Sequence, residues 1–225
     1  MEGALEQRYT KCNGSMLDLS SLQLKELPPL EELSQRFPHL RQLNLRRNAL
    51  RSFPDDLAQV FPQLVALNVS ENALEELPTS IRSFHCLQRL NVAHNRLNEL
   101  SLASFEELEA FEELDARRNL IERILIDNGQ EKLPGSRLRK LQVLLLTDNH
   151  LRSIDTSTTD YLPKLRVIDL SGNPELTEVP EKLRRLHERN LLLHSRAKRR
   201  ELITRALSIR KAVAQALATT SSTSK

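Results

Sequence analysis

Residues 40–54 read LRQLNLRRNALRSFP, and the same spacing of leucines around one asparagine returns along the chain. Residues 64–78 read LVALNVSENALEELP, and residues 165–180 read LRVIDLSGNPELTEVP. Six copies of this motif are separated by 24, 23, 24, 30 and 24 residues, with starts at Leu40, Leu64, Leu87, Phe111, Leu141 and Leu165. Because each copy is too short to bury its own apolar face, the repetition predicts a stack of similar units, a solenoid.

Each motif position has a structural role that its residue type predicts. The Leu-x-Leu triplet, such as Leu43 and Leu45, has the period of two of a half-buried strand. One such strand per repeat predicts a parallel sheet. The asparagine that follows can bond backbone groups that the turn leaves unpaired. We therefore expect a ladder of interior asparagines, made by Asn48, Asn72, Asn95, Asn119, Asn149 and Asn173.

Two apolar columns are predicted to fill the interior behind the strands. One column closes each motif and consists of Phe53, Leu77, Leu100, Ile124, Ile154 and Val179. The other lies three positions before each repeat and consists of Phe37, Phe61, Phe84, Leu108, Leu138 and Leu162. Cys86 directly precedes the motif leucine Leu87, so we expect a buried structural thiol there and not a nucleophile.

The pattern L-x-x-L-x-L-x-x-N-x-L resembles that of leucine-rich-repeat proteins, and the resemblance covers residues 14–189. The prolines that follow the motifs at Pro28, Pro54, Pro78 and Pro180 are similar to those of the intracellular subtype with repeats of 23–24 residues. The resemblance implies an α/β fold: a right-handed horseshoe with a parallel sheet on its concave face and loops or short helices outside. It also implies a non-enzymatic scaffold or adaptor, acting as a subunit of a larger complex.

The repeats divide the chain into four segments. We predict an N-terminal cap or flexible segment at 1–13, the repeat domain at 14–194, a basic helix at 195–218 and a disordered tail at 219–225. The repeat domain holds seven repeats, counting a degenerate copy that starts at Leu17. Residues 190–194, NLLLH, are predicted to add a partial strand that closes the sheet edge. The long fifth repeat is predicted to carry a surface loop within residues 126–140, on the convex or flanking side.

Charge separates an acidic body from a basic C-terminal part. Residues 1–180 carry a net charge of −6, whereas residues 181–217 hold 11 Lys/Arg and 3 Glu. From Ser195 onward, apolar residues recur at helical spacing, and this predicts an amphipathic helix. The stripe consists of Leu202, Ala206, Ile209, Val213 and Ala216, and the basic residues around it are Lys198, Arg199, Arg200, Arg205, Arg210 and Lys211. Such a helix can cap the repeats, occupy a partner's groove, follow nucleic-acid phosphates or lie on an anionic membrane.

The composition argues against catalysis. The six His are scattered, no Cys-x-x-Cys or His-Glu-x-x-His motif occurs, and 5 Gly leave little room for a phosphate-binding loop. We therefore expect neither an enzyme nor a cofactor, metal or small-molecule substrate. Two cysteines far apart, no apolar leader and no long apolar run predict a cytoplasmic or nuclear protein that is not secreted and has no membrane-spanning helix. Of the readings of the basic helix, a membrane contact is the least expected, because the helix lacks aromatic anchors.

The residues that flank the inner leucine of each strand are expected to point out of the concave face. An amide and carboxylate column, a basic track and an apolar patch together predict a protein-binding surface there. Its residues are Asn44, Arg46, Arg47, Asn68, Arg89, Asn91, His94, Asp115, Arg117, Arg118, Val143, Leu145, Asp148, Val167 and Asp169. Two alternatives remain: the arginines could pair with Glu71, Glu113 and Asp115, and the C-terminal segment could cover the apolar patch.

Two functions follow from these surfaces. In the first, the protein binds one or more proteins on its concave face, with the basic helix as a second contact. In the alternative, it is a structural subunit of a ribonucleoprotein and contacts RNA through the basic tail. Phosphate contacts weaken steeply with salt, whereas an apolar interface does not, so salt dependence separates the two.

Overall fold

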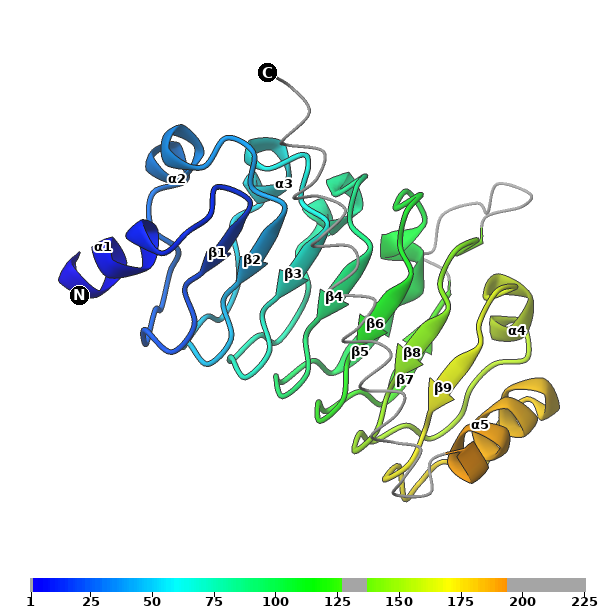
Figure 1. Cartoon of the computed structure of the whole chain (residues 1–225). Coiled ribbons are helices and arrows are strands. Elements are labelled where there is room, and N and C mark those ends of the chain that lie inside the picture. The colour runs from blue at the N-terminus through cyan, green and yellow to red at the C-terminus, as the bar shows by residue number, and fades with distance from the viewer. Residues whose placement is uncertain (1, 127–136, 194–225) are drawn as a thin grey trace.

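The computed structural model describes residues 2–126 and 137–193. In this part of the chain, seven three-residue strands form one parallel sheet, stacked in chain order (Figure 1). They are β1 (Met16–Asp18), β2 (Gln42–Asn44), β3 (Ala66–Asn68), β4 (Arg89–Asn91), β6 (Glu113–Asp115), β8 (Val143–Leu145) and β9 (Val167–Asp169). Each repeat contributes one strand in the same register, so the predicted parallel sheet and solenoid fold are confirmed.

The opposite side of the solenoid consists of short helices and a small second sheet. The helices are α2 (Leu30–Arg36), α3 (Leu57–Val60), η1 (Thr79–Ser83), η2 (Leu102–Phe105) and α4 (Thr158–Tyr161). Successive helices from α2 to η2 contact each other, as the stacking of repeats requires. Strands β5 (Glu99–Ser101) and β7 (Arg123–Leu125) pair in parallel through Leu100 and Ile124.

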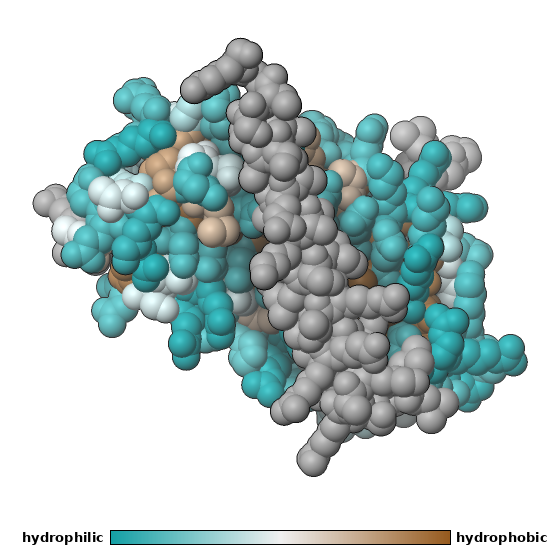
Figure 2. All heavy atoms as spheres, viewed as in Figure 1, coloured by the Kyte–Doolittle hydropathy of each residue, from teal (hydrophilic) through white to brown (hydrophobic). Residues whose placement is uncertain are grey.

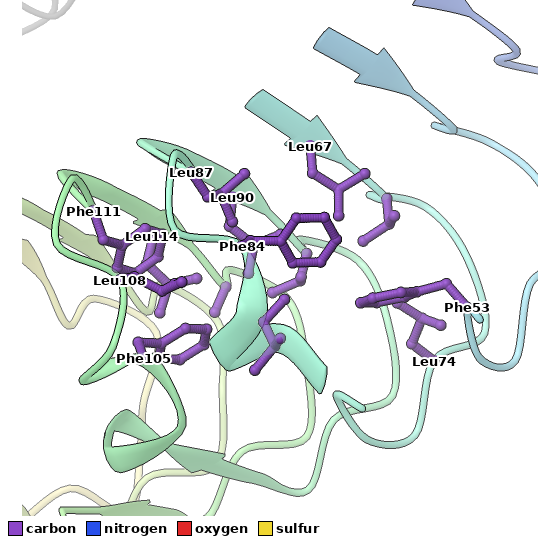
Figure 3. Close-up of a cluster of buried hydrophobic side chains, with 14 of the residues drawn as sticks. Phe53, Leu67, Leu74, Phe84, Leu87, Leu90, Phe105, Leu108, Phe111 and Leu114 are labelled. Carbon is purple, nitrogen blue, oxygen red and sulfur yellow. The ribbon is translucent and has the colours of Figure 1, made fainter. Parts of the chain in front are cut away.

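The core lies between these two layers. Phe61, Phe84, Phe105 and Phe111 are among the largest fully buried side chains, and the last two rings stack with centroids 5.0 Å apart (Figure 3). The column that precedes the repeats is buried throughout, as predicted. The column that closes the motifs is buried at Phe53, Leu100 and Ile154 and only partly buried at the other three positions.

The predicted asparagine ladder is present, and each side chain links two repeats. Asn95 accepts the Leu74 N–H at 3.0 Å, and its Nδ2 donates to the carbonyls of Val69 at 3.0 Å and Val92 at 2.9 Å. Asn173 makes the equivalent three bonds between the sixth and seventh repeats. Each amide thereby satisfies buried backbone groups of its own repeat and of the one before it.

Helix α1 (Glu2–Thr10) covers the first repeat. Tyr9 is buried and packs edge-to-face against Phe37, with ring centroids 5.5 Å apart. Arg8 donates to the Ser20 carbonyl at 3.0 Å, at the open edge of β1. Residues 2–10 are therefore helical and pack on the first repeat.

The prediction of a partial strand at residues 190–194 is wrong. Helix α5 (Glu181–Leu193) includes residues 190–193 of this segment, the part that the structure describes, and packs against β9 at the other end of the sheet (Figure 1). His187 Nδ1 accepts the Leu170 N–H at 3.3 Å, and Asn190 donates to the Ile168 carbonyl at 3.3 Å. These side chains bond the backbone groups that a further strand would have paired, so the edge is closed by a helix.

The buried thiol predicted at Cys86 is also wrong. Cys86 is exposed because it lies in the turn after Phe84, which turns its side chain outward before Leu87 enters the core. The loop predicted within residues 126–140 falls mostly outside the described residues, as do the basic helix predicted at 195–218 and the tail at 219–225.

The ladder generates a stability prediction. Asn95→Ala should lower the free energy of unfolding by about 3 kcal/mol, because it leaves three buried backbone groups without their partner. The matched control is Asn91→Ala in the same repeat, since Asn91 is only partly buried and accepts one local bond from the Ala93 N–H. That control should cost less than about 1 kcal/mol. Urea unfolding followed by circular dichroism measures both, and equal losses would contradict the role of the ladder.

The edge helix generates a second prediction. Leu183→Asn should detach α5, because Leu183 is 2% exposed and a buried amide without partners is costly. The uncovered β9 edge should then pair with other chains, seen as concentration-dependent growth in mass by light scattering. Lys182→Asn, one residue earlier and exposed, is the control and should stay monomeric. A monomeric Leu183→Asn chain at the highest concentrations would show that α5 does not protect this edge.

Candidate functional site

The concave face carries side chains in columns because the strands are in register. The central column has its members at the third residue of each strand, and these are Asp18, Asn44, Asn68, Asn91, Asp115, Leu145 and Asp169. Neighbouring strands of a sheet lie about 4.8 Å apart, so the members of a column are within contact distance. The predicted amide and carboxylate column is therefore formed, with one apolar member.

The polar members of this column also have a local structural role, which the sequence analysis missed. In six of the seven sheet strands, the side-chain oxygen accepts the backbone N–H two residues later, as Asn68 does from Ser70 at 3.0 Å. This bond shapes the turn that leaves the strand. Leu145 has no acceptor to offer to Thr147. At β8 the leucine therefore removes the hydrogen bond that shapes the turn and also replaces a polar side chain with an apolar one.

The predicted basic track is not a free positive surface. The two carboxylate oxygens of Glu71 accept hydrogen bonds from Arg46 Nε at 2.7 Å and from Arg47 Nε at 2.8 Å. Arg117 forms two bonds to Asp115, at 2.9 and 2.7 Å, and Arg118 contacts Asp148 at 3.1 Å. The alternative in which the arginines pair with Glu71 and Asp115 is thus observed, and Asp148 is a partner that the sequence analysis missed.

These hydrogen bonds and ion pairs favour the charged forms of the carboxylates and arginines on the concave face. The Arg46 and Arg47 guanidinium groups hold the pKa of Glu71 below its usual range. Burial opposes the ionisation of Asp169, but hydrogen bonds from the Ser171 side chain and backbone outweigh it and keep the pKa of Asp169 low. The Asp115 carboxylate raises the pKa of Arg117. The concave face therefore presents fixed charges of both signs at neutral pH.

The residue before each ladder asparagine adopts a left-handed backbone conformation. Five consecutive repeats place a side chain there, with φ between +54° and +58°, at Arg47, Glu71, His94, Arg118 and Asp148. The last repeat has Gly172 at φ +69°, and a Cβ there would come 2.1 Å from Asp148 Oδ1. For a residue other than glycine, the left-handed conformation costs about 1–2 kcal/mol of stability. These five residues are therefore present at positions where glycine would be the less strained choice.

The predicted apolar patch lies on β8 and β9. Val143 and Val167 are register partners, and Leu145 lies next to Asp169 and Asp115 in the central column. All three apolar side chains are partly exposed. The face seen in Figure 2 is mostly hydrophilic, with hydrophobic residues gathered in smaller areas. A cluster of exposed apolar side chains on a sheet face is one of the features that mark an interface.

The remaining predicted residues lie apart from this patch. Arg89 is the first residue of β4, beside Glu113 on β6, and His94 is exposed on the turn that follows β4. The basic residues Lys198, Arg199, Arg200, Arg205, Arg210 and Lys211 fall outside the described residues. Within residues 2–126 and 137–193, His, Cys, Asp and Glu side chains form no cluster able to hold a metal ion. No helix in the same ranges has the length and apolar character needed to cross a membrane.

The family model described as leucine rich repeat matches residues 38–97 and 139–194, just over half of the chain. The chain therefore belongs to the leucine-rich-repeat family. Domains of this family generally mediate protein–protein interaction, and the fold is generally non-enzymatic. A comparison with curated protein sequences gives no significant match.

Three solved structures illustrate the likeness. The repeat domain of the type III effector XopL has a TM-score of 0.61 at 24% identity, over 80% of this chain and 59% of that one. Pollen Receptor Kinase 3 has a TM-score of 0.54 at 25% identity, over 74% and 76%. A leucine-rich-repeat protein of Leptospira interrogans has a TM-score of 0.50 at 25% identity, over 74% and 48%. The chain thus spans about half the length of the first and last of these structures.

The Glu71 ion pairs generate a pH prediction. Because its folded pKa is lowered, Glu71 contributes stability above the unfolded glutamate pKa of about 4.3, and this contribution is lost as pH falls through the folded value. Arg46→Gln should move the pKa of Glu71 back toward its usual range, as seen in a carboxyl ¹³C titration. Arg51→Gln is the control, since Arg51 is exposed and absent from the pair. An unchanged Glu71 titration in Arg46→Gln would contradict the assigned pairing.

Proposed function

We propose that this protein is a non-enzymatic scaffold that binds a protein partner on its concave face, with the basic C-terminal segment as a second contact. The observation that carries the proposal is Leu145, the one apolar member of the central column in the described sheet. It gives up the turn bond that the other strands make and sits beside Val143 and Val167. An apolar partner surface would bury all three side chains.

The charges around the patch support a protein partner over a nucleic acid. Arg117 and Arg118 are already paired with Asp115 and Asp148, so they offer phosphates a neutralised surface. Fixed charges of both signs instead select a partner by complementarity and fix its orientation. Arg118 and Asp148 lie in the turns that follow β6 and β8, and they carry charged side chains where the backbone conformation favours glycine, which fits this use.

The proposal includes a cytoplasmic or nuclear location. Both Cys12 and Cys86 are free, and Cys86 is exposed. Exposed free thiols suit a reducing compartment, where glutathione keeps them reduced.

The apolar patch generates the central test. Leu145→Asp should weaken partner binding at least tenfold, about 1.4 kcal/mol, because it removes buried apolar area and desolvates a charge. The partner is identified by affinity co-purification and mass spectrometry, and its affinity is then measured by calorimetry with purified components. Leu120→Asp is the matched control, since Leu120 is an exposed leucine away from the concave strands. Arg117→Glu is unsuitable, because it would leave the buried Asp115 facing a second carboxylate.

Each outcome of this test is informative. Weakened binding in Leu145→Asp and unchanged binding in Leu120→Asp support the scaffold. Unchanged binding in both variants contradicts the use of the concave face. If nuclease treatment removes the co-purified material and its binding falls steeply with salt, the ribonucleoprotein alternative replaces the scaffold.

A further inference from the structure

The C-terminal segment begins beside the apolar patch. Helix α5 ends at Leu193 and packs against β9, the strand that carries Val167. Residues 194–225 follow, and they hold eight Lys/Arg and one Glu. Residues 1–193 carry a net charge of −4. A strongly basic segment is thus tethered to an acidic domain at the sheet end where the patch lies.

The length of this segment matches the sheet. A helix rises 1.5 Å per residue, so residues 195–217 would form a helix about 34 Å long. Seven strands at a spacing of about 4.8 Å span about 29 Å between the first and the last. A helix that starts at β9 can therefore cross the whole concave face to β1 without an intervening linker.

The chemistry of the two surfaces is also complementary. The apolar stripe of Leu202, Ala206 and Ile209 would otherwise face water, and so would the patch on β8 and β9. Asp169 is the register partner of Leu145, and Asp148 lies in the turn that follows β8. Glu71 lies in the turn that follows β3, and Glu71 and Asp148 already pair with arginines of this face, with which the basic segment would compete. The basic residues beside the stripe would lie over these carboxylates, within the range at which charges are not screened.

We propose that residues 195–217 dock as a helix across the concave face of their own chain, with the apolar stripe facing the sheet and its first member, Leu202, nearest to Val143, Leu145 and Val167. This inference rests on the proposed function, since it makes the same surface self-occupied until a partner displaces the segment. Only chains whose concave face is free can bind the partner. Self-occupancy therefore lowers the apparent affinity for the partner in proportion to the fraction of chains in which the face is free. Displacement also releases the basic helix, which then becomes available as the second contact.

Zero-length coupling of lysines to carboxylates in the full-length chain tests the docking. Carbodiimide treatment of the monomer should link Lys198 to Asp148 or Asp169, near β9. Lys211 lies nine residues after Leu202, about 180° around a helix and so on the side that faces solvent in the docked state, and it should form no such link. Peptide mass spectrometry of the monomer band reads out these pairs.

Matched variants of the segment identify the docked face. Ile209→Asp should reduce these links at least fivefold, because it places a charge in the apolar stripe. Thr204→Asp is the control: it changes a β-branched residue to the same charge on the opposite side of the helix and should keep the links. Equal linking in both variants, or links spread over carboxylates of the helical layer, would overturn the proposal. Links found only in covalent dimers would assign the face to a second copy and would also overturn it.

The same variants separate this inference from the proposed function. In the Ile209→Asp chain the face is uncovered, so partner affinity should rise at least threefold over the natural chain. Leu145→Asp added to that chain should again weaken binding tenfold. If the links are absent but Leu145→Asp still weakens binding, the docking is wrong and the scaffold stands. If the links are present but Leu145→Asp has no effect on any partner, the scaffold is wrong and the docking stands.

Discussion

Each turn of this solenoid leaves backbone N–H and C=O groups directed toward the turn before it, and the ladder asparagine satisfies both sets at once. Asn95 joins Leu74 and Val69 of the preceding repeat to Val92 of its own. A carboxylate could not donate and a hydroxyl is too short to reach three partners, so an amide is the side chain that fits. The spacing of the repeats, and hence the register of the sheet, follows from this contact.

The ladder also determines what the concave face can display. It holds the residue before each asparagine in a left-handed conformation, and the strand residue three positions before that one normally bonds the turn. Much of the polar character of this face is therefore structural. Leu145 departs from this pattern, and Arg118 and Asp148 carry a charge where glycine would adopt the backbone conformation without strain. Folding does not explain these residue types, so these positions are the candidates for a functional role.

The periodicity of the sequence predicted the sheet, the ladder and the buried phenylalanines because one residue type recurs for one physical reason in every repeat. The error at Cys86 falls in a turn between two repeats, where the period does not define which way a side chain points. The error in the fold falls where the repetition stops. Residues 190–193 look like another Leu-rich strand, but they belong to α5, which bonds the β9 edge through His187 and Asn190 instead. The members of the concave face could be read from the strand period, whereas the Arg118–Asp148 pair joins different repeats and depends on turn geometry that the period does not contain.

Leu145 can be weighed against the residues it replaces. An amide or carboxylate at this position gains a turn bond worth about 1 kcal/mol, and a leucine forfeits it. Burying a leucine side chain gains about 1.5–3 kcal/mol, but only when something covers it. In the bare sheet, leucine is the poorer choice, and in a covered sheet it is the better one. The residue therefore favours whichever state buries β8, and Val143 and Val167 add to the same preference. Because the docked C-terminal segment and the partner would both bury this patch, the two states compete for the same stabilisation, and the outcome depends on which of them buries Leu145 more completely.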